Sequence, residues 1–405
     1  PATQAPPYSV TVGKSGSANY ASTLAQPYDP AARLGWTPRT INLTTGASSN
    51  LNSLVMDPIF LNPTTYQWNL NFQYEFLPKW VVEIGYVGSR SIHQTSTVTF
   101  ESQINGAKLA SVAQPINGVT TNTVGNASIR VPYLGFSPGG LGTDRTRGDD
   151  KFNSIQATVR KQFSHGLQMQ AAYSYSRSFD TATYNNFNDP LVSVYGPNSN
   201  YRPHRLTINY SYELPFGQRQ GFIGKVANGW SIAGVTVIQN GSPLTIIDTR
   251  GGTIYGFGGS SPVQSTAQFA AGKTKADVAT TGDIHTRLGG VSGGVGYFDP
   301  NAFGVTPILG TFPDTGRGYG NSGLGIVLGP GQVNFDGTLQ KITRVGGIRE
   351  DANLVFRAEF FNMFNHAQFS NPTGAQTDIS KSNFGQITST SVNPRLIQFA
   401  LKYVF

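Results

Sequence analysis

The segment YQWNLNFQYEF, from Tyr66 to Phe76, decides the fold class of this chain. Its even positions are aromatic or aliphatic, and its odd positions carry amides or an acid. Because successive side chains of a β-strand point to opposite faces, the segment predicts a strand with one apolar face and one polar face. The spacing of apolar residues in a helix fits this segment less well.

The same two-faced pattern recurs along the chain. Clear alternation occupies 80–86, 155–160, 167–176, 206–213, 333–340, 354–360 and 397–405, and a weaker segment covers Trp230–Gln239. Recurrent strands of about ten residues with alternating hydrophobicity predict an all-β fold, an antiparallel transmembrane β-barrel with lipid outside and a polar lumen. Such a sheet must close, because hydrocarbon satisfies no backbone hydrogen bonds. The alternative is a soluble β-sandwich or propeller, whose strands are usually about five or six residues long.

Composition agrees with a barrel. Only 38% of the residues are hydrophobic, and no run approaches the roughly eighteen apolar residues of a spanning helix, which excludes a helical membrane protein. The formal net charge is +8, but the basic residues are scattered singly, so we expect no nucleic-acid partner. The absence of cysteine fits an envelope compartment in which thiols oxidise.

The gaps between the alternating segments predict the organisation of the chain. Residues 1–62 are expected to form a loop or extended lead-in, and residues 63–405 to form β-barrel strands with long loops. One further strand is expected at Ile92–Phe100, and long connections at Phe179–Arg202 and Ser242–Gly331. Loops of this length are typical of the outer side of a barrel. No internal repeat and no second globular domain is expected.

The barrel prediction assigns places to several aromatic and charged residues. We expect the membrane-interface aromatics to be Trp80, Tyr86, Tyr173, Tyr175 and Trp230. Arg357 and Glu359, two apart on the polar face, are expected to form an ion pair on the wall. The alternation reaches the carboxylate, and the residues predicted to form an assembly signal read by the barrel-assembly machinery are Phe399, Leu401, Tyr403 and Phe405. The alternative for these four is an ordinary last strand.

No catalytic constellation is found. The five histidines have no i, i+4 pairing, and the glycine-rich RGGTIYGFGG (Arg250–Gly259) lacks the ending of a phosphate loop. We therefore expect no enzyme, no cofactor and no metal. The charged cluster around position 147 is expected to be a solvated hairpin loop, with a bound cation such as calcium as the alternative; its residues are Asp144, Arg145, Arg147, Asp149 and Asp150.

Several blocks in the second half resemble a known family. The blocks HRLTINYSYELPFG (His204–Gly217), LVFRAEFFNMFNHAQFSNPTG (Leu354–Gly374) and PRLIQFALKYVF (Pro394–Phe405) occur in the order of Oar-like TonB-dependent outer-membrane receptors. Such receptors are abundant in Acidobacteria-type genomes and often carry a carboxypeptidase-regulatory-like domain. The resemblance implies a barrel of about 22 strands closed by an N-terminal plug, and uptake of bulky ligands driven by TonB.

The chain departs from that family in length, and it has no plug and no recognisable TonB box, so it is expected to be the C-terminal barrel portion of a longer receptor. TonB is then a partner only through the missing N-terminal part. The favoured function is uptake of a large or scarce ligand in the bacterial outer membrane, with outer-membrane lipid as a partner. Two alternatives remain: a processed fragment that self-associates by strand edges into a surface layer or filament, and a passive porin of smaller strand number.

Overall fold

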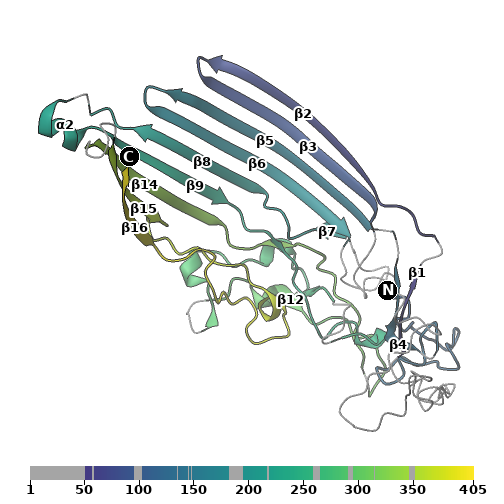
Figure 1. Cartoon of the computed structure of the whole chain (residues 1–405). Coiled ribbons are helices and arrows are strands. Elements are labelled where there is room, and N and C mark those ends of the chain that lie inside the picture. The colour runs from purple at the N-terminus through teal and green to yellow at the C-terminus, as the bar shows by residue number, and fades with distance from the viewer. Residues whose placement is uncertain are drawn as a thin grey trace, which may run out of the picture.

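Figure 1 shows the computed structural model as one long sheet with its longer connections gathered at one end. The structure describes residues 51–56, 59–94, 103–134, 136–144, 146, 148–181, 195–216, 219–258, 265–290, 295–313, 315–345 and 352–405. Within these ranges no helix has the length and apolar character needed to cross a bilayer.

Nine strands pair in chain order, each antiparallel to the next. They are β2 (Thr64–Leu77), β3 (Trp80–Gln94), β5 (Gly148–Ser164), β6 (Leu167–Thr181), β8 (His204–Glu213), β9 (Trp230–Gln239), β14 (Gln332–Arg344), β15 (Asn353–Phe361) and β16 (Leu396–Val404). The short β7 (Tyr195–Pro197) adds to β6. Every alternating segment predicted from the sequence is a strand. The sheet is open among the described residues, with β2 and β16 at its edges.

The register keeps apolar and polar residues in separate rows across the sheet. One row joins Phe72, Ile84, Ala157, Tyr173, Leu206, Ile238 and Val333, and the adjacent row joins Asn71, Gly85, Gln156, Ser174, Arg205, Gln239 and Gln332. Because a slip of one residue would exchange the two faces of a strand, this separation fixes the register of the whole wall.

The large apolar side chains of the sheet remain exposed. Phe72 and Phe399 are 67% and 68% exposed, and among the buried hydrophobic residues only Ala358 belongs to the nine strands. The sandwich or propeller alternative is therefore wrong, because either fold would bury these rows against another sheet. An exposed apolar wall of this extent is the surface that a bilayer covers.

Connections differ between the two ends of the sheet. At one end, here called the turn end, His165 and Gly166 link β5 to β6 with positive φ values of 52° and 76°, which suits a tight hairpin. The helix α2 (Gly221–Ala227) also lies at the turn end, between β8 and β9. The opposite end, here called the loop end, carries the connection between β9 and β14 (Figure 1). Short turns at one end and long loops at the other are typical of outer-membrane barrels.

The predicted long connection Ser242–Gly331 folds around a buried core, and we call its described residues the loop body. Ile246, Val278 and Phe298 are fully buried there, and Phe384, from the connection before β16, packs against them. The short strands are β10 (Pro243–Leu244), β11 (Gln268–Phe269), β12 (Phe303–Gly304) and β13 (Val327–Leu328), and the 3₁₀ turns are Thr253–Tyr255, Lys275–Asp277, Ile284–Thr286, Pro300–Ala302 and, after β15, Gly374–Thr377. The sequence predicted this long connection but did not show its core, because these apolar residues follow no regular period.

A buried arginine joins the segment 103–134 to the loop body. The Arg130 side chain has no exposed surface, and its Nη2 donates to the carbonyl oxygens of Ile254 at 2.7 Å and Thr123 at 3.0 Å. Its Nε donates to Oδ1 of Asn126 at 2.7 Å, and its Nη1 donates to the carbonyl of Lys108. Burial lowers the pKa of Arg130, but guanidinium groups remain charged in proteins. The charge of the buried guanidinium is thus compensated by three backbone carbonyls and one side-chain amide oxygen.

Two local predictions are corrected by the structure. Ile92–Gln94 end β3 instead of beginning a separate strand, and residues 95–100 lie outside the described residues. Asp149 and Asp150 belong to β5 and not to a hairpin loop, because register with β3 extends to this point. Asp149 pairs with Arg90 at 2.9 Å. Arg145 and Arg147 lie outside the described residues, and Asp144 ends β4 (Phe136–Asp144).

Two further predictions concern the wall and the lead-in. The ion pair between Arg357 and Glu359 is confirmed, with Nε and Oε1 separated by 3.0 Å. In the lead-in, β1 (Leu51–Met56) is an extended segment that pairs in parallel with β4. Residues 1–50 lie outside the described part of the chain.

Candidate functional site

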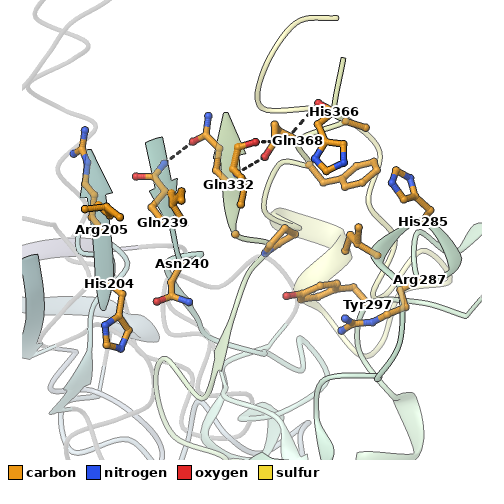
Figure 2. Close-up of a pocket in the computed structure, with 18 of the residues that line it drawn as sticks. His204, Arg205, Gln239, Asn240, His285, Arg287, Tyr297, Gln332, His366 and Gln368 are labelled. Atoms are coloured by element: carbon orange, nitrogen blue, oxygen red, sulfur yellow. Dashed lines mark hydrogen bonds between the residues drawn. The ribbon is translucent and has the colours of Figure 1, made fainter. Parts of the chain in front are cut away.

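A cavity of about 890 Å³ opens where the loop body meets the loop end of the sheet. Its lining residues come from β6, β8, β9 and β14 and from loop segments around His285 and His366, and Figure 2 shows most of them. Its volume falls within the range of about 300–1,000 Å³ that small-molecule sites occupy. We call this cavity the loop-end pocket.

At the loop end of the sheet, residues of the apolar face line the pocket instead of facing lipid. Leu206, Ile238 and Val333 are direct register partners on neighbouring strands, and Tyr173 precedes them in the same row. Ile284 and Phe369 close the pocket from outside the sheet. The lining is therefore mainly apolar and suits the apolar part of a ligand.

Basic and titratable side chains surround this apolar lining. These residues are His204, Arg205, His285, Arg287 and His366, and no Asp or Glu is among the described residues that line the pocket. From β8, His204 and Arg205 point in opposite directions, as Figure 2 shows. A cavity bordered by cationic groups and no carboxylate favours anionic groups on whatever enters it.

Contacts with its neighbours hold Arg287 in place. Its guanidinium lies 4.6 Å from the ring centroid of Tyr297, and its Nε donates to Oγ1 of Thr280 at 2.9 Å. The Tyr297 hydroxyl donates to the carbonyl of Leu328 at 3.0 Å. Burial raises the pKa of Tyr297, and the nearby Arg287 opposes part of that rise. Tyr297 is thus a neutral donor at physiological pH, while Arg287 presents a fixed cation.

A side-chain amide completes the sheet beside the pocket. Gln368 accepts from the backbone N–H of Val333 at 2.7 Å and donates to its carbonyl at 2.8 Å. Val333 precedes Gly337, where pairing of β14 with β15 begins, so Gln368 replaces a strand at this position. A hydrogen bond between Gln239 and Gln332 joins β9 to β14 nearby (Figure 2). These bonds fix the wall of the pocket.

The three histidines have separate partners. The Tyr173 hydroxyl and Nδ1 of His204 are 2.7 Å apart, and the His285 ring meets Phe369 edge-on with 5.4 Å between centroids. The backbone N–H of His366 donates to Asn362. Within the described ranges, no three His, Asp or Glu side chains gather as metal ligands would. The arrangement of these histidines suits contact with a bound ligand.

The predicted site residues lie on the sheet and not in one site. Phe399, Leu401, Tyr403 and Phe405 lie on or directly after the edge strand β16, and all four are exposed. Trp80 and Trp230 begin β3 and β9 at the turn end, whereas Tyr86, Tyr173 and Tyr175 lie farther along their strands. Only Tyr173 lines the loop-end pocket. The assembly and interface roles of these residues remain predictions.

The sequence did not identify the residues of the pocket. No two histidines have the i, i+4 spacing of a metal site. The three that line the pocket come from the first residue of β8, from a 3₁₀ turn of the loop body and from the connection before β16. The one local signal is that His204 and Arg205 directly precede a strongly alternating strand. This position shows that His204 and Arg205 lie at one end of a strand, but it does not show which loop residues lie opposite them.

One known protein family matches this chain over nearly its whole length. The family model described as "Outer membrane beta barrel domain" matches residues 1–398. The chain is similar in structure to the outer membrane transporter YddB from Escherichia coli, with a TM-score of 0.41 and 11% identity over 88% of this chain and 34% of the transporter. It is also similar to BauA, the ferric preacinetobactin receptor from Acinetobacter baumannii, with a TM-score of 0.36 and 9% identity over 84% of this chain and 29% of the receptor.

The chain thus spans about a third of the length of these two proteins. Among curated proteins, no sequence matches it. The family match covers nearly the whole chain, and the exposed apolar rows of the sheet are what that family requires in the bacterial outer membrane. This chain belongs to the outer membrane β-barrel domain family.

Proposed function

We propose that this chain forms part of the wall and the ligand-contacting surface of an outer-membrane receptor that imports a large or scarce ligand. The observation that carries the proposal is a lipid-facing wall that ends in a folded loop body with a basic-rimmed apolar pocket. A receptor needs recognition at the end of the wall where long loops lie. Binding and transport, not catalysis, fit this arrangement.

The loop body favours a receptor over a passive porin. A porin lumen is a water-filled channel, and its loops need only leave a polar path. Here Ile246 and Phe298 are fully buried in a connection that also lines an apolar cavity, which is the construction of a recognition surface. The blocks around Leu354–Gly374 and Pro394–Phe405 support the finer assignment to Oar-like TonB-dependent receptors.

The open edges bear on the size of the complete barrel. The outer edges of β2 and β16 are open among the described strands, and the chain spans about a third of the proteins to which it was compared. We propose that the wall continues into a larger barrel, in keeping with the roughly 22 strands of plugged outer-membrane transporters. Energised uptake then depends on TonB acting through the rest of that receptor.

Conductance and gel mobility test the proposal. The chain is expressed in the outer membrane, extracted in mild detergent, and run with and without heating, because closed barrels change mobility on heating. The same preparation is added to planar bilayers. A receptor wall predicts heat-dependent mobility with little steady conductance, and long-lived open channels would instead show a porin.

Self-assembly is a second candidate, favoured by one observation. The side chains of both edge strands, β2 and β16, are exposed along their whole lengths, and an unpaired strand edge is a template for another chain. If the working form is a surface layer or filament, unheated material will stay at the well or in the pellet at every detergent concentration. A discrete band that shifts on heating would exclude this form.

A further inference from the structure

The helix α2 (Gly221–Ala227) lies at the turn end, away from the loop body (Figure 1). Its apolar side chains are strongly exposed: Phe222 is 81% exposed, Ile223 61% and Val226 54%. Positions 222, 223 and 226 share one face of a helix. Only Gly224 of this helix is buried, so α2 does not serve to pack against the sheet. An exposed apolar face of this kind needs an apolar partner.

Two side chains of the lipid-facing wall hold the end of α2. Trp230 Nε1 donates to the carbonyl of Val226 at 2.9 Å, and Lys341 Nζ donates to the carbonyls of Val226 at 2.9 Å and Asn228 at 2.8 Å. Carbonyl groups at the C-terminal end of a helix have no hydrogen-bond partner within the helix, and these two side chains supply one. The helix is thereby fixed to the wall.

The positions of these two residues show on which side of the wall α2 lies. Trp230 and Lys341 are register partners on β9 and β14. Their row continues to Phe356 on β15 and Leu401 on β16, and it lies on the apolar face of the sheet. A helix held by side chains from this row lies on the side of the sheet that faces lipid. It lies at the depth where the strands end.

A second lysine and tryptophan lie on the apolar face at the turn end of another pair of strands. Lys161 lies on the apolar face as the register partner of Trp80 at the turn end of β3, and its Nζ is 5.7 Å from the Trp80 ring centroid. Lys341 and Trp230 repeat this pairing at 5.0 Å. Lysine and tryptophan on a lipid-facing surface mark the boundary between hydrocarbon and headgroups. The helix α2 is therefore at a headgroup level.

The charge around α2 has one sign. The segment from Leu214 to Trp230 contains Arg219 and Lys225 and no acidic residue. The nearest acidic residue before this segment is Glu213, which lies on the polar face of β8. A short helix with an apolar face, one cation in its last turn and another just before it matches a membrane surface that carries anionic phospholipid.

We propose that α2 is an interfacial anchor that inserts Phe222, Ile223 and Val226 into the acyl boundary of the leaflet at the turn end. Arg219 and Lys225 then lie against anionic phospholipid headgroups. The anchor fixes the depth of the wall between β8 and β14 in the bilayer. It goes beyond the proposed receptor function and needs only the placement of the wall in a membrane.

The absence of cysteine makes a single-cysteine test direct. Phe222→Cys in the full chain is labelled with the environment-sensitive dye NBD and reconstituted into vesicles of phosphatidylcholine, with or without phosphatidylglycerol. Vesicles with doxyl groups at a shallow or a deep acyl position report depth by quenching. Ile84→Cys on the wall and Phe312→Cys, a site 91% exposed in the loop body, are the matched controls.

The anchor predicts blue-shifted NBD emission at position 222, with stronger quenching by shallow than by deep doxyl lipid. Ile84→Cys should be quenched by lipid, and Phe312→Cys only by aqueous iodide. Replacing Arg219 and Lys225 by glutamine should weaken the preference of the label for phosphatidylglycerol vesicles by about fivefold per charge.

Two results would overturn the proposal. One is iodide quenching at position 222 equal to that at position 312 while Ile84→Cys is still quenched by lipid. That outcome leaves the wall in the membrane and removes only the anchor. The other is protection of position 222 that appears without lipid and rises with protein concentration, which would assign the helix face to a second copy of the chain.

Discussion

The lipid-facing assignment of the sheet is tested most sharply by an adjacent pair of residues on β5. Ile155 and Gln156 lie in the middle of this strand, are both exposed, and point to opposite faces. Ile155 pairs with Tyr86 and Tyr175 in an apolar row, whereas Gln156 belongs to the polar row. If both faces of the sheet met water, an arginine would cost about the same at the two positions. A difference in stability between Ile155→Arg and Gln156→Arg therefore reports contact of one face with the bilayer.

The cost of the first substitution follows from the depth of the site. An arginine at the bilayer midplane on the lipid face of a barrel costs about 2–4 kcal/mol. Tyr86 and Tyr175 flank position 155 and offer ring faces to a guanidinium, so the expected loss is about 2 kcal/mol. On the polar face, Gln156→Arg should stay within about 0.5 kcal/mol of the parent chain.

Folding into vesicles measures this difference. The full chain is refolded from urea into phosphatidylcholine vesicles, and the folded fraction at each urea concentration is read from the gel mobility shift. Ile155→Arg should move the midpoint to lower urea at an unchanged slope, and Gln156→Arg should leave it in place. Equal shifts for the two variants, or a larger shift for Gln156→Arg, would refute the assignment of the apolar rows to lipid.

Three further outcomes are expected for the loop body and its pocket. Arg130→Met removes the donor to the carbonyl of Ile254 and should destabilise the loop body by about 1–3 kcal/mol, seen as faster proteolysis of residues 103–134 with unchanged heat-dependent mobility. Gln368→Ala leaves the N–H and carbonyl of Val333 without this amide and should speed hydrogen exchange at Val333, whereas Gln368→Glu should restore only the accepting bond. Burial raises the pKa of Tyr297 above its usual 10.0, so this phenol contributes full stability below about pH 10 and loses it as the pH rises through the raised pKa. Tyr297→Phe should remove that alkaline loss in a pH series of loop-body proteolysis, and an unchanged profile would contradict the assignment.

Predictions from the sequence succeeded where the determining contacts are local. Alternation at Tyr66–Phe76 and its repeats located all nine strands of the wall, because the two-residue period of a strand is visible within one segment. The pairing of Arg357 with Glu359 was also predictable, since both residues lie on one face of one strand. The prediction of a separate strand at Ile92–Phe100 was wrong at residues 92–94, because β3 extends beyond its alternating part, and residues 95–100 lie outside the described residues.

The pocket and the loop body were decided only by tertiary structure. His204 begins β8, whereas His285 and His366 belong to two separate connections, and Gln368 supports Val333 across 35 positions of sequence. The buried core around Phe298 has no period, because irregular backbone sends its side chains inward at uneven intervals.

By itself, then, the sequence determined the two-faced wall, since a repeating pattern of apolar and polar residues fixes both strand and register. The place of α2 depended on long-range contacts, because its end is held by Trp230 and by Lys341, which lies more than a hundred residues further along the chain. Which loop residues face one another at the end of the wall likewise depends on how distant segments close over it, and no local pattern encodes that closure.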